Sequence, residues 1–214
     1  MGFFMDIDCI GCLHGYYPKL FGGDLLIVTG DLTSRDEPIE HLEFIQWLDV
    51  QPYKHKIVIA GNHDHNIDGD EIDSLENTYY LKNELITIED VTFWGSPHSL
   101  WFDRINPKCC AFTSHDTELV NVYSHIPDET NVLISHTPFH GMLDQNRDGY
   151  HCGSKSLRDA IDRVKPILFV CSHIHEQGGN EMMYKHQGPN TWCVNCSIMN
   201  EKYQPVNQPI RMII

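Results

Sequence analysis

The stretch Lys56-Ile57-Val58-Ile59-Ala60-Gly61-Asn62-His63-Asp64 joins a strand pattern directly to a polar cluster. After the lysine, residues 57–59 are apolar and β-branched, as in a buried strand. Gly61 permits a sharp turn because it lacks a Cβ. An amide, an imidazole and a carboxylate then follow at the carboxyl end of the strand. Ligands of open α/β sheets bind beyond such strand ends, so this stretch is a candidate site.

A βαβ pattern leads into this stretch and predicts the fold class. Residues 24–29 predict a buried strand that ends at Gly30-Asp31. Acidic residues and a proline at 36–38 predict the start of a helix, and Pro52 predicts its end. Because a helix separates the two strands, we expect them to be parallel.

Three further strand patterns, at residues 5–10, 131–135 and 166–171, also end in polar groups. The residues that follow them are Cys12, His14, His136, His173 and His175. Taken alone, each is more often a turn former or a hydrogen-bonded surface residue than a ligand. Their recurrence at equivalent strand ends predicts that they gather at one edge of one sheet.

The mixture of donor types indicates a dinuclear metal site. The carboxylate of Asp31 has two oxygens and can bridge two cations, while imidazole and amide groups complete two separate ligand sets. Two cations about 3.5–4 Å apart activate a water and bind the oxygens of a phosphate ester. This donor set favours Mn, Fe or Zn over Mg or Ca. We therefore predict two divalent metal ions, with an unligated imidazole free to protonate the leaving alkoxide.

The composition restricts the partners that the chain can have. Its 214 residues include 30 Asp and Glu against 15 Lys and Arg, a formal net charge of −15. This charge argues against a broad nucleic-acid or anionic-membrane surface. No apolar run approaches the roughly 18 residues of a membrane span, and no signal peptide is recognisable. We expect one domain over residues 1–214, a cytoplasmic location and no membrane partner.

The eight cysteines, without a secretory signal, favour free thiols over a disulfide framework. Two pairs, Cys9/Cys12 and Cys193/Cys196, have the C-x-x-C spacing that structural zinc sites use. Both pairs lie in strand-like sequence, where residues three apart point to opposite faces. We therefore interpret most of these cysteines as small buried hydrophobic residues and retain structural zinc as the alternative.

Other segments carry weaker patterns. We expect a hairpin whose turn is Glu89-Asp90, a loop at 95–97 and a helix that begins at Thr113-Ser114. Residues 139–152 form a long polar connection of the kind that is usually functional or mobile. Ser154 is expected to cap a helix.

The order of the polar groups resembles the calcineurin-like metallophosphoesterase superfamily. That family reads Asp-x-His, Gly-Asp, Gly-Asn-His-Asp/Glu, His and Gly-His-x-His, and matching residues extend over 12–175. Residues 22–27, 95–97, 172–176 and 203–210 are similar to its brain-type, class III cyclic-nucleotide-phosphodiesterase-like branch. The resemblance implies an α/β fold in which two mixed β-sheets pack face to face with helices on the outside, the αββα sandwich.

The resemblance also implies a role for each polar residue. One metal ion would be held by Cys12, His14, Asp31 and His175. The other metal ion would be held by Asp31, Asn62, His136 and His173. His63 would stabilise the transition state or protonate the leaving group, and Asp64 would orient His63.

Two positions depart from the family pattern. Ser172 replaces a Gly, which is a small-for-small change expected to be tolerated. Cys12 replaces the first Asp, and a thiolate would favour Zn or Fe over Mn. An active enzyme with altered metal preference, one weakened metal site and a largely inactive relative all stay open, and we favour the first.

The leading interpretation is a metal-dependent phosphodiesterase that acts on small phosphodiesters such as cyclic nucleotides. A phosphomonoesterase, protein phosphatase or nuclease on the same site is the alternative among enzymes. The alternative that is not an enzyme is a metal- or nucleotide-binding module without turnover, and Cys12 in place of an Asp is the main support for it. The roles of His65, His98, His140 and His151 stay open, and a surface position is the default expectation for them.

Overall fold

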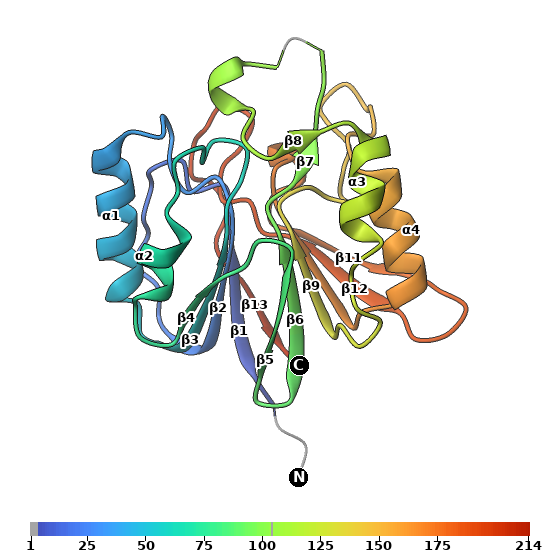
Figure 1. The fold of residues 1–214 in the computed structure, drawn as a ribbon, viewed down its shortest axis with the longest axis horizontal. Helices are drawn as coiled ribbons and strands as arrows, with labels where there is room; N and C mark the ends of the chain where they lie inside the picture. Colours follow the sequence, from blue (N-terminus) through green and yellow to red (C-terminus); the bar gives the residue numbers. More distant parts are fainter. Residues whose placement is uncertain (1–3, 104) are drawn as a thin grey trace.

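A computed structural model describes residues 4–103 and 105–214. Two large β-sheets face each other, and helices cover the outer side of each sheet (Figure 1). This arrangement is the αββα sandwich that the family resemblance implies. Among the helices of the described residues, we find none with the length and apolar character needed to cross a membrane.

The first sheet has five strands in the order β13-β1-β2-β3-β4. Its strands are β1 (Asp6–Ile10), β2 (Gly23–Thr29), β3 (Tyr53–Ile59), β4 (Thr78–Tyr80) and β13 (Ile210–Ile213). Strands β1 to β4 are parallel, as predicted for β2 and β3, and β13 is antiparallel to β1. Helices α1 (Pro38–Asp49) and α2 (Gly69–Asp73) pack on the outer face.

The second sheet has six strands in the order β11-β12-β10-β9-β6-β5. Its strands are β5 (Glu84–Ile88), β6 (Val91–Ser96), β9 (Val132–Ser135), β10 (Leu168–Cys171), β11 (Asn180–Tyr184) and β12 (Thr191–Asn195). Strands β6, β9, β10 and β12 are parallel, whereas β5 and β11 are antiparallel edge strands. Helices α3 (Asp116–Tyr123) and α4 (Lys155–Val164) cover its outer face (Figure 1).

The short elements lie in the connections. They are β7 (Ser99–Leu100), β8 (Thr113–Ser114) and the 3₁₀ helices η1 (Pro107–Cys109) and η2 (His175–Gln177). Strands β7 and β8 pair with each other in parallel. Helix η2 follows β10, and η1 lies between β7 and β8.

The central strands, such as β2, β3, β9 and β10, are apolar in unbroken runs because both of their faces are buried. In β2, Ile27 points into the layer between the sheets, while Leu26 and Val28 point toward α1. Residues from the second sheet, among them Ile134 and Val170, complete the layer between the sheets. This period of two fixes which side chains face the helices and leaves the strand ends to carry polar groups.

The prediction that the polar residues gather at one edge of one sheet is wrong. Strands β1, β2 and β3 belong to the first sheet, but β9 and β10 belong to the second. Both sheets present the carboxyl ends of their parallel strands at the same end of the sandwich, and the polar groups of both meet there. The site is therefore an interface between two sheets.

Local predictions had mixed outcomes. The hairpin is confirmed, and Glu89 and Asp90 adopt φ values of 48° and 67° that suit a tight turn between β5 and β6. Ser154 caps α4, as predicted, by accepting a hydrogen bond from the Leu157 N–H at 3.0 Å. The predicted loop at 95–97 is partly wrong, because Gly95 and Ser96 lie in β6. A Cβ at Gly95 would be 2.6 Å from the Leu81 side chain, so neighbouring residues require the glycine.

The predicted helix start at Thr113-Ser114 is also wrong. These two residues form β8, and α3 begins at Asp116. The backbone N–H of His115 donates to the Glu118 carboxylate at 3.0 Å, which completes a capping box one turn into the helix. The N-cap of α3 is therefore His115, and neither Thr113 nor Ser114 caps the helix.

Candidate metal centre

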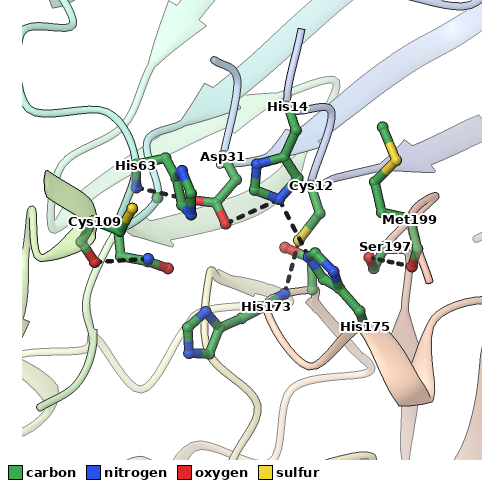
Figure 2. Close-up of polar contacts among 12 residues, drawn as sticks. Cys12, His14, Asp31, His63, Cys109, His173, His175, Ser197 and Met199 are labelled. Atoms are coloured by element: carbon green, nitrogen blue, oxygen red, sulfur yellow. Dashed lines mark hydrogen bonds and ion pairs between the residues drawn. The ribbon is translucent and has the colours of Figure 1, made fainter. Parts of the chain in front are cut away.

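Polar side chains from both sheets form two groups of potential metal ligands. In the first group, which Figure 2 shows, the ligand atoms of Cys12, His14, Asp31 and His175 all lie within 4.8 Å of one another. In the second group, those of Asp31, His136 and His173 meet the same limit. Asp31 belongs to both groups.

The two carboxylate oxygens of Asp31 face different groups. Its Oδ2 lies 3.6 Å from Nε2 of His14, and its Oδ1 lies 3.4 Å from Nε2 of His136. Burial opposes ionisation, but the imidazoles of His136, His63 and His14 together hold the pKa of the Asp31 carboxyl well below its usual range. Asp31 is therefore an ionised carboxylate placed to bridge two cations.

Asn62 adds an oxygen to the second group. Its Nδ2 donates a hydrogen bond to the carbonyl oxygen of Cys109 at 2.9 Å. Because a carbonyl can only accept, this contact fixes the orientation of the amide and leaves Oδ1 facing the group. Oδ1 lies 3.0 Å from Nε2 of His136.

Backbone carbonyls fix the tautomers of two imidazoles. Nδ1 of His136 lies 2.8 Å from the carbonyl oxygen of Thr29, and Nδ1 of His175 lies 3.1 Å from that of Asn200. Each Nδ1 must be the donor, so in the neutral imidazole Nε2 presents a lone pair toward the ligand group. Metal-ligating histidines are usually held in this way.

Protonation states also suit metal binding. Burial lowers the pKa of His14 to about 3 and that of His173 to about 3, and it lowers the pKa of His175 as well. These imidazoles are therefore neutral, which is the ligating form. His136 differs: burial lowers its pKa, but the Asp31 carboxylate, with the Thr29 carbonyl and Asp64, raises the pKa overall. A cation bound beside Asp31 would compete with that proton.

Cys12, a member of the first group, is completely buried. Its Sγ accepts a hydrogen bond from the backbone N–H of His173 at 3.1 Å. Burial raises the pKa of the Cys12 thiol well above its ordinary value. A thiolate at this position therefore needs a nearby positive charge, and a metal ion held by His14 and His175 would provide one. The residues present fit a soft divalent cation in this group.

The backbone is strained at these ligand positions. Cys12, His14, Asp31 and His173 have positive φ values of 50°, 45°, 51° and 66°. Each such residue costs on the order of 1–3 kcal/mol and persists only where surrounding structure holds it. Their concentration at one point indicates that the loops are shaped to aim these side chains.

Gly61 is needed because it lacks a Cβ, as predicted. A Cβ at Gly61 would lie 2.4 Å from Oδ1 of Asp31 and 2.7 Å from Cε1 of His136. Gly61 therefore allows the chain to pass against the shared carboxylate. The Ser172 substitution is accommodated, because its hydroxyl donates to the carbonyl oxygen of Thr29 at 2.9 Å.

His63 lies beside Asp31 at a cleft. Its backbone N–H donates to Oδ1 of Asp31 at 3.0 Å, and its Nδ1 lies 3.2 Å from the carbonyl oxygen of Ser34. The imidazole lines a cleft with a volume of about 340 Å³. Because Nδ1 donates to Ser34, Nε2 is the nitrogen left for a substrate.

Among the described residues, no hydrogen bond joins the Asp64 carboxylate to the His63 ring. The expectation that Asp64 orients this ring directly is therefore wrong. The Asp64 carboxylate is completely buried and accepts from the backbone N–H groups of Leu32, Thr33 and Gly61 at 2.8–3.1 Å. The turn at 61–64 directs Asp64 inward and His63 toward the cleft. Burial and the neighbouring Asp31 raise the pKa of Asp64 to about 6. Asp64 therefore supports the loop that carries Asp31.

The cleft contains residues that sequence reasoning missed. Besides site residues, its lining consists of Phe102, Ile105, Asn106, Cys109, Glu176, Glu201 and Tyr203. Tyr203 belongs to the family-like segment 203–210, which was a usable signal. The contact between Asn62 and the Cys109 carbonyl could not be predicted from the sequence, because every residue type has the same backbone carbonyl.

The structure does not support zinc at the cysteine pairs. All eight cysteines are free thiols, as predicted. Cys193 packs in the core beneath α3 and α4, whereas Cys196 packs between the sheets. In the described part of the chain, neither of them nor Cys9 joins a metal-sized donor group.

The four histidines whose roles stayed open in the sequence lie outside both donor groups. His65 and His151 are exposed, as expected, but His98 and His140 are half-buried. The connection 139–152 is organised around the buried Asp144, which accepts from His151 Nδ1 at 2.7 Å.

Comparisons with known proteins agree with this geometry. A family model described as calcineurin-like phosphoesterase matches residues 5–177. The UPF0046 protein K07C11.7 of Caenorhabditis elegans is 32% identical over 227 residues, which cover 97% of this chain and 74% of that protein. Metallophosphoesterase domain-containing protein 1 of Homo sapiens is 32% identical over 216 residues, which cover 88% of this chain and 64% of that protein.

The fold has solved counterparts. One crystal structure aligns with a TM-score of 0.67 over 90% of each chain, at 14% sequence identity. Similarity at this level supports the architecture alone. The alignment with the human relative spans less than two thirds of that protein's length.

Proposed function

The chain belongs to the calcineurin-like phosphoesterase family, and on that premise we propose that it is a dinuclear-metal-dependent phosphodiesterase that hydrolyses small phosphodiesters such as cyclic nucleotides. Family membership supports metal-dependent phosphoester hydrolysis. One observation carries the proposal: Asp31 is shared by two ligand groups at the edge of a cleft that His63 also lines. Similarity to the human metallophosphoesterase domain-containing protein supports the branch.

In this proposal, one metal ion is held by Cys12, His14, Asp31 and His175, and the other by Asp31, Asn62, His136 and His173. Two divalent ions, of Mn, Fe or Zn, would supply an activated water and positive charge for the phosphate oxygens. The chain's own residues do the rest. The Thr29 and Asn200 carbonyls accept from Nδ1 of His136 and His175 and orient Nε2 of each neutral imidazole toward the ligand groups, and the Cys109 carbonyl holds Asn62 in place.

His63 is proposed to protonate the leaving alkoxide. Its Nδ1 donates to the Ser34 carbonyl at 3.2 Å, so the imidazole is oriented with Nε2 available at the cleft. Its backbone N–H also donates to Asp31, which ties the position of the acid to that of the shared carboxylate. A proton delivered from a fixed imidazole contributes about 10²–10⁴-fold to such reactions.

The cleft favours a small substrate. A volume of about 340 Å³ is at the lower end of the range of small-molecule sites. The net charge of −15 disfavours a long polyanion such as a nucleic acid. Eight free thiols support a cytoplasmic site of action as part of the proposal.

Hydrolysis of a phosphodiester and a monoester, measured side by side with Mn, tests the proposal. We expect cyclic AMP and bis(p-nitrophenyl) phosphate to be hydrolysed with a higher kcat/KM than p-nitrophenyl phosphate. Turnover of the monoester alone would favour a phosphatase on the same site. Turnover of neither class would favour a binding module without catalysis.

The second candidate, a binding module, is favoured by the buried thiol of Cys12 in place of a carboxylate. Cys12→Asp separates the possibilities. If Cys12 is a ligand in an active enzyme, the aspartate variant shifts metal preference, and the ratio of activity with Mn to activity with Zn rises about tenfold or more. The measurement is phosphodiesterase activity of protein reconstituted with each metal.

Cys152→Asp is the matched control, because Cys152 is half-buried and lies outside both donor groups. It should leave the metal ratio unchanged. An unchanged ratio in Cys12→Asp would show that Cys12 does not ligate. A rise from one to two bound metal equivalents would instead show that Cys12 weakens one site.

A further inference from the structure

Tyr203 is an aromatic wall of the cleft to which no role has been given. Its ring centroid lies 4.8 Å from that of His14, 5.0 Å from that of His175 and 6.4 Å from that of His63. The first two contacts are edge-on. The residue is nevertheless 56% exposed. Part of the ring therefore packs on the imidazoles, and part remains open at a cleft that it lines.

A dedicated turn holds Tyr203 in this position. Its φ is 57°, and a bulky residue in the left-handed region is a conformational outlier. Its N–H donates to the Asn200 carbonyl at 2.9 Å, and Oδ1 of Asn200 accepts from the N–H groups of Lys202 and Gln204. The same Asn200 carbonyl accepts from Nδ1 of His175. The turn thus joins the position of Tyr203 to that of a candidate ligand.

A second exposed aromatic ring lines the same cleft. Phe102 is 54% exposed, and Ile105, which also lines the cleft, is buried. Exposed rings at a site gain most when they cover another flat, apolar surface. A nucleobase has such a surface on both faces, whereas a ribose has none. Stacking on protein aromatic rings therefore binds any of the bases, because every base has a flat face.

We propose that Tyr203, together with Phe102, forms an aromatic subsite that selects nucleobase-bearing phosphoesters over phosphoesters that carry only the sugar. This inference rests on the proposed function, because it defines the substrate class of that same site. Tyr203 is a specificity-determining residue that contacts the base and takes no part in the transfer of protons. Its hydroxyl is not required, since stacking uses the ring face.

Equilibrium binding of AMP and of ribose 5-phosphate to the Mn-loaded protein tests the subsite. The wild type is expected to bind AMP about tenfold or more tightly than ribose 5-phosphate, which corresponds to one stacking contact. Tyr203→Ala is expected to bring the two affinities within about twofold of each other, and Tyr203→Phe to keep the wild-type ratio. Tyr150→Ala, at a tyrosine 71% exposed and outside the described cleft lining, is the control and should change neither affinity.

Equal weakening of both ligands in Tyr203→Ala would overturn the inference, because it would show that Tyr203 only supports His14 and His175. Equal or absent binding of the two ligands by the wild type would overturn it as well. Hydrolysis of cyclic AMP, measured in parallel, separates the two proposals. Base-selective binding without hydrolysis contradicts the proposed function alone, and hydrolysis without base selectivity contradicts the subsite alone.

Discussion

Asp31→Asn is expected to lose both metal ions and more than about 10³-fold of the phosphodiesterase activity. Both ligand groups depend on this carboxylate, whose two oxygens face His14 and His136. An amide keeps one acceptor oxygen and loses the charge, so neither group stays complete. The readouts are metal equivalents per chain and kcat for a phosphodiester.

The variant is expected to fold. Asp31 has a φ of 51°, and asparagine tolerates the left-handed region better than other non-glycine residues. Its Oδ1 can still accept the hydrogen bond that the His63 N–H donates at 3.0 Å. Loss of metal without loss of the cooperative unfolding transition is therefore the predicted pattern.

Asp36→Asn is the matched control. Asp36 also has a positive φ, of 59°, and also contacts an imidazole, with Oδ1 2.8 Å from Nε2 of His41. It lies outside both donor groups. The control should keep two metal equivalents and nearly full activity. Two metal equivalents retained in Asp31→Asn would contradict the bridging role.

His63→Ala is expected to reduce kcat for cyclic AMP by about 10²–10⁴-fold while both metal equivalents remain. The reason is that an alkoxide leaves poorly without a proton. A p-nitrophenolate leaves without protonation, so hydrolysis of bis(p-nitrophenyl) phosphate should fall far less. The measurement is the ratio of the two kcat losses.

His65→Ala serves as the control, because His65 is an exposed imidazole on the same loop. It should leave both substrates unaffected. Equal losses for the two substrates in His63→Ala would mean that His63 positions Asp31 through the loop and does not act as the acid. Equal near-zero rates for the wild type and His63→Ala would favour a module without turnover.

The sequence predicted the strands that carry the site better than their assembly. Apolar, β-branched runs identify β2, β3, β9 and β10, because both faces of these strands are buried. Because these strands are buried on both faces, their sequences show no alternation of polar and apolar residues, and nothing in them indicates which sheet each strand joins. Asp31 and His136 therefore looked like neighbours in one sheet, although they meet across two.

Adjacency in the sequence misled the assignment of Asp64. A turn places successive side chains in different directions, and here the Asp64 N–H bonds to the Gly61 carbonyl at 3.2 Å. His63 is thereby directed to the cleft while Asp64 reaches three backbone N–H groups beneath it. The family-like segment pointed to Tyr203, but its place in the cleft could not be predicted, because it depends on a left-handed turn at a residue type that rarely adopts one.

Anomalous scattering from crystals of the metal-loaded protein, recorded across the absorption edges of Mn, Fe and Zn, tests the central claim most directly. The predicted result is two peaks on either side of Asp31. One peak lies within bonding distance of Cys12 Sγ, His14 and His175, and the other lies within bonding distance of Asn62, His136 and His173. A single peak, or two peaks that do not share the Asp31 carboxylate, would contradict the account.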